Sequence, residues 1–138
     1  MGMSLWALTG FAGWALLLVV AMIFYRIPLV LSMRKRADAW TRGNEVEQPA
    51  VMTRVEGAYA NCLEMLPIFA SVVLVAAVAD AESITAGLAG WFLLARIGQS
   101  VAHIISVHHL MIFFARFPFF LVQVLILGYW IVALLQSA

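Results

Sequence analysis

Long stretches without a charged residue constrain this chain more than any other feature of its sequence. Residues 5–25 contain no charged side chain and are rich in Leu, Val, Ala, Phe and Trp. A helix needs about 20 such residues to cross the roughly 30 Å hydrocarbon core of a bilayer. A cleaved signal peptide fits less well, because no basic residue precedes the run and the run is too long. The sequence therefore predicts a first membrane span over residues 5–29.

The composition leads to the same conclusion for the whole chain. Of 138 residues, 65% are hydrophobic and 11% are charged, and the net charge is +1. Soluble domains contain about 25% charged residues, because a core needs polar groups to cover it. This composition excludes an ordinary soluble domain, a disordered chain and a nucleic-acid-binding protein that acts through net charge. The single cysteine, Cys62, excludes an intrachain disulfide framework.

Three further spans follow from the same pattern, over residues 50–79, 83–108 and 116–136. The second span begins with a polar half, so we expect its first turns to project beyond the bilayer. Residues 80–82 make a very short turn into the third span, which places these two helices side by side. Pro118 suits the first turn of the last helix, where its missing N–H is not needed. The predicted fold is a single all-α integral membrane domain over residues 1–138, a bundle of four transmembrane helices.

The positions of the basic residues predict the orientation. All eight lie between Arg26 and Arg116, and four of them fall in the polar connection 33–51. The turn at 80–82 and both ends of the chain carry none. Cytoplasmic loops carry an excess of Lys and Arg. We therefore expect the 33–51 loop to be cytoplasmic, both termini to lie outside, and the protein to occupy the inner, or cytoplasmic, membrane.

Polar residues inside the spans form two stripes. Ionisable side chains there cost about 2.5–3.5 kcal/mol at the span centre on insertion scales and usually face a partner or a cavity. On the second span, Arg54, Asn61 and Glu64 fall on one helical face. On the third span, a face repeats at i, i+3, i+4 and i+7 and contains Arg96, Gln99, Ser100 and His103. We expect the two stripes to meet, with Glu64 balancing Arg96 or Arg54.

Two interpretations of these stripes stay open. They can be interhelical contacts that only fix the bundle, because polar contacts between spans are common. Alternatively, the excess of arginine over the one deep carboxylate, Glu64, suits an anionic ligand that enters from the cytoplasmic side, since Arg binds carboxylates bidentately.

The histidines, the cysteine and the large aromatic residues give no strong indication of a functional site. His103, His108 and His109 lack a carboxylate or cysteine at a metal-binding spacing, so we expect no metal. Cys62 is expected to be a small buried hydrophobe. The large aromatic residues are expected in interface belts or facing lipid: Trp6, Trp14, Trp91, Trp130 and Tyr129.

The segment from Arg54 to Phe69, RVEGAYANCLEMLPIF, resembles the signature of the MAPEG proteins, the membrane-associated proteins in eicosanoid and glutathione metabolism. In that family the second helix carries an Arg, then Ala, then Asn-x-x-Glu, then Pro and Phe in this register. The layout also resembles the family: four spans, a long basic loop after the first and a tight turn after the second. Ala95 and Arg96, followed by polar residues at positions 99 and 103, resemble its third helix.

The resemblance implies a homotrimer in the lipid bilayer, with three cytoplasm-facing sites between subunits that each bind glutathione as a cosubstrate. It implies a glutathione-dependent transferase or peroxidase that acts on lipophilic electrophiles or hydroperoxides. Arg116 is the best match for the arginine that helps to activate the thiol. The residues that match the glutathione-binding positions, directly or as their neighbours, are Arg34 or Arg36, Arg54, Asn61, Glu64, Arg96, Gln99 and His103.

The chain differs from the well-studied members at identifiable positions. Gly57 stands where they carry Arg, and His103 stands where Tyr often contacts glutathione. The interval from Arg96 to Arg116 is also longer. The alternative function is a non-catalytic lipid-binding or accessory subunit, and a channel or small transporter ranks third.

Overall fold

The fold is an all-α bundle, as predicted. The computed structural model describes residues 1–41, 44–106 and 108–138, so Arg42 lies outside the described residues. Within them, four helical segments are long and apolar enough to cross a membrane. The elements are α1 (Met3–Leu31), α2 (Ala50–Val78), α3 (Glu82–Ile105), and a last segment made of α4 (His109–Met111), the π-helical turn η1 (Ile112–Arg116) and α5 (Phe117–Ser137).

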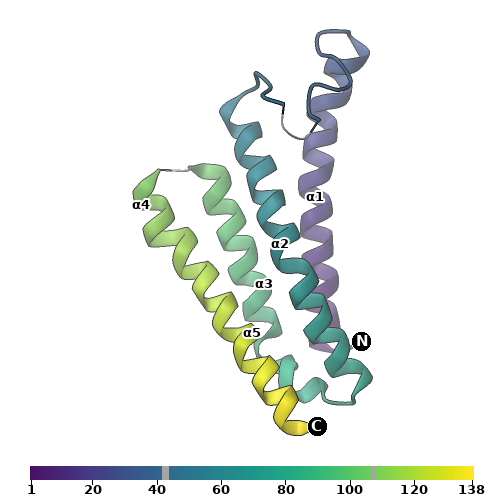
Figure 1. Ribbon diagram of the computed structural model, residues 1–138, viewed down its shortest axis with the longest axis vertical. Coiled ribbons are helices and arrows are strands. Elements are labelled where there is room, and N and C mark those ends of the chain that lie inside the picture. The colour runs from purple at the N-terminus through teal and green to yellow at the C-terminus, as the bar shows by residue number, and fades with distance from the viewer. Residues whose placement is uncertain (42–43, 107) are drawn as a thin grey trace.

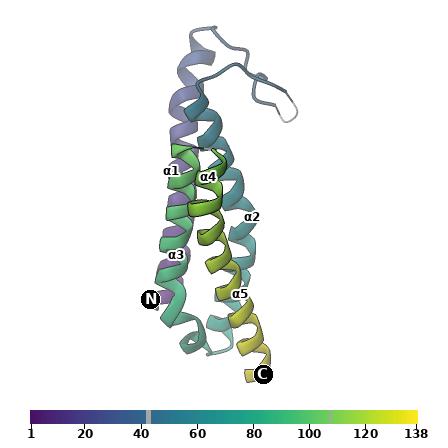
Figure 2. The ribbon, with the colours of Figure 1, turned by 90° about the vertical axis from the view of Figure 1, so that its left-hand side faces the viewer.

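The helices run side by side, with α3 at the centre of the contacts. It packs against α1, α2 and α5. Both termini lie at one end of the bundle, and the polar connection between α1 and α2 lies at the other (Figures 1 and 2). The 29 residues of α1 and of α2 make helices of roughly 44 Å. Both extend beyond α3 at the loop end (Figure 1).

Four aromatic rings, one from each long helix, form the centre of the core. Phe11, Phe69, Phe92 and Trp130 are each 0% exposed. The Phe69 and Phe92 rings stack with centroids 4.2 Å apart, and the Trp130 centroid lies 6.0 Å from each of them. The expectation that Trp130 faces lipid or an interface belt was wrong. Its ring is held inside because the phenylalanines of α2 and α3 provide a flat stacking surface for it.

The last helix starts earlier than expected. Its first residue is His109, and α3 ends at Ile105, so the connection between them is shorter than residues 108–115. Pro118 explains how the helix continues through the predicted boundary. Its ring removes an N–H and clashes with the carbonyl four residues earlier, and the helix widens there instead of ending. The backbone N–H of Phe117 accordingly donates to Ile112, five residues back.

Two helix ends use a left-handed residue that is not glycine. Asp80 ends α2 with φ 54°, and the Ala81 N–H donates to the Ala76 carbonyl at 2.8 Å. Met33 ends α1 with φ 60°, and the Arg34 N–H donates to the Leu29 carbonyl at 2.9 Å. These six-to-one bonds are those of the Schellman motif, which satisfies the last carbonyls of a helix.

Candidate functional site

A buried arginine lies where the polar stripes of α2 and α3 meet. Arg96 is 1% exposed, and its Nη1 donates to the main-chain carbonyl of Asn61 at 3.2 Å. Its Nε and Nη2 are also buried and have no hydrogen-bond partner among the described residues. An unpaired buried donor is costly, and a charged one more so. These two nitrogens therefore remain as donors for an acceptor outside the described part of the chain.

The pocket beside Arg96 has one polar and one apolar wall. Its volume is about 230 Å³, which is below the roughly 300–1,000 Å³ of pockets for drug-sized ligands. It therefore fits one end of a larger molecule. The polar wall comes from α2 and α3, and the apolar wall from α2 and α5. The lining residues are Asn61, Glu64, Arg96 and Gln99 on the polar side, and Met65, Ile68 and Phe120 on the apolar side.

A second cleft adjoins this pocket toward the loop end of the bundle. It measures about 560 Å³ and is lined by Gln48, Ala50, Thr53, Arg54, Gly57 and His103. Asn61 and His103 separate the two spaces, because the Asn61 amide nitrogen lies 3.0 Å from His103 Nδ1. Arg54 Nε donates to the main-chain carbonyl of Ile104 at 2.6 Å, which ties α2 to the end of α3.

Gly57 and His103 fit each other. A Cβ atom on Gly57 would lie 2.8 Å from both Cε1 and Nε2 of His103, closer than side-chain atoms pack. The imidazole thus occupies space that any larger residue at position 57 would need. Gly57 and His103 are therefore linked by packing in this chain.

The expected ion pair of Glu64 with Arg96 or Arg54 was wrong. In the described part of the chain, the salt bridges join Arg26 to Glu56 and Arg36 to Asp38. Arg54 and Arg96 donate to main-chain carbonyls instead. Glu64 lies at the exposed rim of the pocket, so its carboxylate remains available to a ligand or a neighbouring chain.

The structure does not bring the remaining predicted residues into the pocket. Arg34 and Arg36 lie on the loop after α1, where both line a separate hollow. There, Arg36 Nε lies 3.1 Å from the Asp38 carboxylate. Arg116 is the last residue of η1, which packs against α3. Its Nε is buried without a hydrogen-bond partner in the described ranges.

A comparison with known proteins identifies the family of this chain. The family model described as the MAPEG family matches residues 4–136. This chain belongs to the MAPEG family. No curated protein and no solved structure matches it. In this MAPEG chain, Asn61 and Glu64 of α2 line the pocket beside Arg96.

Gln123 is a buried polar residue that contacts the pocket lining of this MAPEG chain and is not among the residues predicted from the sequence. It is 0% exposed on α5, and its Nε2 donates to Gln99 Oε1 at 2.8 Å. A signal was present, because Gln123 is the one polar side chain between Pro118 and Gly128. A lone amide in an apolar span usually faces a partner.

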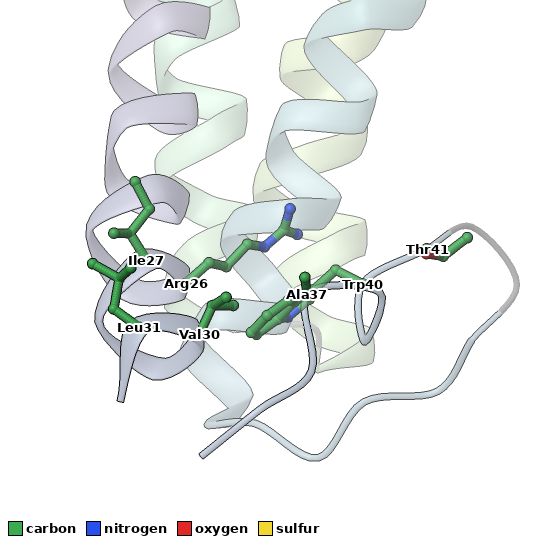
Figure 3. A pocket seen from close by; sticks show the side chains of 7 residues that line it. All are labelled: Arg26, Ile27, Val30, Leu31, Ala37, Trp40 and Thr41. Carbon is green, nitrogen blue, oxygen red and sulfur yellow. The ribbon is translucent and has the colours of Figure 1, made fainter. Parts of the chain in front are cut away.

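A larger cavity of this MAPEG chain lies elsewhere, at the loop end of α1. It measures about 660 Å³ and is lined by Arg26, Ile27, Val30, Leu31, Ala37, Trp40 and Thr41. Figure 3 shows Arg26 and Val30 extending from α1 toward Trp40. The Arg26 guanidinium lies 5.3 Å from the Trp40 ring centroid and 2.6 Å from Glu56. The only charge in this lining is already paired, so we do not assign ligand binding to it.

Metal binding has no geometric support in the described residues. No group of three His, Cys, Asp or Glu side chains there lies close enough together to hold a metal ion.

Proposed function

We propose that this MAPEG protein is a glutathione-dependent transferase or peroxidase that acts on lipophilic electrophiles or hydroperoxides. One observation carries the proposal: Arg96 is buried at the wall of the pocket with two guanidinium nitrogens that lack partners in the described chain. Asn61 and Glu64, which match the family's glutathione-binding positions, line the same pocket. Glutathione is an anionic tripeptide, so its charges complement this arrangement.

The pocket residues complement both the anionic and the cationic groups of glutathione. The free Arg96 nitrogens are donors for a carboxylate or a thiolate. The Glu64 carboxylate at the rim can accept from the ammonium group. Since the pocket holds only one end of a molecule of this size, the rest extends along the polar stripe toward the cleft of Arg54 and His103.

The chemistry follows from the two walls. Glutathione supplies the thiol nucleophile. Cationic donors favour a thiolate over a thiol, so Arg96 stabilises the charge that forms when the proton leaves to solvent. We assign Arg116 a second, supporting role in that stabilisation. Its position at the end of a π-helical turn is consistent with function, because such turns occur frequently at functional sites. Met65, Ile68 and Phe120 provide an apolar surface for a lipophilic partner that arrives from the bilayer.

A trimer would complete the site. Glu64 is exposed in the single chain although it lies on a membrane-spanning helix. A carboxylate that faces lipid is costly, so a neighbouring subunit that covers α2 removes this cost. Arg34 or Arg36 from the loop of an adjacent subunit would then contact a glutathione carboxylate.

Glutathione binding tests the proposal. In detergent solution, millimolar glutathione should raise the thermal unfolding midpoint of the wild-type protein, and Arg96→Met should abolish that rise. Losing a charge-assisted hydrogen bond costs roughly 1.5–3 kcal/mol, so Glu64→Gln should weaken glutathione binding about 10-fold or more. Asp80→Asn is the matched control, because it removes a carboxylate at the other end of α2 and Asn tolerates the left-handed backbone there.

Enzymatic activity needs its own measurement. Conjugation of glutathione to a lipophilic halogenated aromatic compound, and reduction of a lipid hydroperoxide, should both be assayed in liposomes. If glutathione binds and neither activity appears, or if it does not bind at all, the non-catalytic lipid-binding or accessory role replaces the enzyme.

A further inference from the structure

The hydrogen bonds of Gln123 determine which way its amide group points. Its Nε2 has two acceptors, the main-chain carbonyl of Phe119 at 3.0 Å and Gln99 Oε1 at 2.8 Å. A main-chain carbonyl can only accept a hydrogen bond. The Gln123 atom beside Phe119 must therefore be the amide nitrogen. Its second hydrogen must then meet an acceptor, which is the oxygen of Gln99.

Gln99 is consequently fixed in orientation. Its oxygen is occupied by Gln123, and its amide nitrogen makes no hydrogen bond within the described residues. Gln99 lines the same pocket as Arg96, so this N–H₂ group is left for the pocket. Without Gln123, the side-chain amide of Gln99 could rotate by 180° and present its oxygen to the pocket. That oxygen would repel an anion.

The pocket wall formed by Arg96 and Gln99 therefore carries donors only. Arg96 Nε and Nη2 are free of partners in the described chain, and Gln99 adds two amide hydrogens. Glu64, the acceptor, lies at the exposed rim. The donors of Arg96 and Gln99 are thus buried, whereas the Glu64 carboxylate is exposed.

We propose that Gln123 is a positioning residue that holds the amide N–H₂ of Gln99 toward the pocket, so that the wall of Arg96 and Gln99 takes the anionic group of the ligand. The inference rests on the proposed function for the identity of that ligand, because glutathione offers a carboxylate and a thiolate. The donor chemistry is independent of the proposed function, since any carboxylate or sulfonate of suitable size would accept hydrogen bonds from the same donors.

A double-mutant cycle with glutathione as the probe tests this inference. Met matches Gln in length and has no amide. Gln99→Met should weaken glutathione binding about 10-fold, as expected for a lost hydrogen bond to a charged group. Gln123→Met should weaken it about threefold or more in the wild type and have no effect in the Gln99→Met background. An equal loss in both backgrounds would mean a merely structural role for Gln123 and would overturn the inference.

A second variant keeps the test valid if Gln123→Met does not fold. Gln99→Glu retains an oxygen for Gln123 but presents another oxygen to the pocket, where it pairs with Arg96. Glutathione binding should be lost while the contact between α3 and α5 remains. Retained affinity in Gln99→Glu would overturn the inference. Gln136→Met, the same change at an exposed position near the end of α5, is the control and should bind as the wild type does.

Simple anions distinguish this inference from the proposed function. Succinate and methanesulfonate should be tested beside glutathione for a rise in the thermal unfolding midpoint. If glutathione has no effect but these anions stabilise the wild type and not Gln99→Glu, the proposed function fails and the donor wall stands. If glutathione binds equally to the wild type and to both Gln99 variants, the function stands and the donor wall fails. If no anion stabilises the wild type, both fail.

Discussion

At the scale of single residues, the polar side chains of the bundle divide into those that already have partners and those that lack them. Arg54 is joined to the carbonyl of Ile104 and Asn61 to the ring of His103. Arg96 keeps two nitrogens without partners in the described chain. The bonds of Arg54 and Asn61 join α2 to α3, whereas the unpaired donors of Arg96 support the proposed ligand site.

Gly57 gives a prediction at this scale. Gly57→Ala should leave the free energy of unfolding nearly unchanged, because the new methyl group displaces His103 and breaks its hydrogen bond with Asn61, a loss of about 1 kcal/mol that offsets the gain from a better helix former. In a His103→Ala background the same change should stabilise by roughly 1 kcal/mol, since Ala is the better helix former. Denaturant unfolding of the four variants measures both effects. An equal gain in both backgrounds would show that His103 does not occupy this space.

The candidate site could be predicted from sequence only in part. The face containing Arg54, Asn61 and Glu64 follows from helical spacing, and Asn61 and Glu64 do line one pocket. The partners could not be predicted, because a guanidinium can pair with a main-chain carbonyl as well as with a carboxylate. The sequence pattern shows side-chain charges and does not show carbonyls left accessible by the packing of α2 on α3.

At the scale of elements, proline and the left-handed residues determine where helices end. Pro118 was expected to start a helix, and the helix instead passes through it by widening into η1. The ends of each span could be predicted to within a few residues where a polar loop or tight turn interrupts the apolar run. The prediction was less accurate at residues 106–116, because that connection is itself largely apolar and hydropathy does not mark its limits.

Met33 gives a prediction for the end of α1. A left-handed conformation costs a non-glycine residue about 1 kcal/mol or more, and the Met33 side chain is 90% exposed, so it contributes little packing. Met33→Gly should therefore stabilise the protein by up to about 1 kcal/mol. Met33→Ala, which keeps a Cβ atom, should give no gain. Unfolding in mixed micelles compares the three proteins, and an equal gain in both variants would contradict the backbone explanation.

At the scale of the whole molecule, the bundle places the long polar loop at one end and both termini at the other (Figure 1). The number of spans, their pairing and the class of fold could be predicted, because each follows from the bilayer thickness and from short connections. The stacking of Phe11, Phe69, Phe92 and Trp130 could not be predicted, because lipid and protein core are equally apolar and hydropathy does not distinguish an inward face from an outward one.

The orientation in the membrane can be tested with single cysteines. Thr41→Cys in a Cys62→Ala background should react with a membrane-impermeant maleimide only from the cytoplasmic side, since the basic loop is expected there. Ser83→Cys, an exposed residue at the other end of the bundle, should react only from outside. Labelling of intact and inverted membrane vesicles separates the two cases. The reverse pattern would invert the topology and move the arginine-rich loop to the external face.

The π-helical turn has a consequence for how the last helix is phased. Five residues there complete a turn that ordinarily takes fewer, and each residue of an α-helix advances the angle by about 100°. The residues before Ile112 are therefore rotated by roughly that angle relative to an unbroken helix drawn back from Gln123. One added residue can be absorbed in this turn without breaking the ladder. The turn thus changes the azimuth of the residues before it, whereas Arg116, at its end, stays nearly in phase with Gln123, seven residues later.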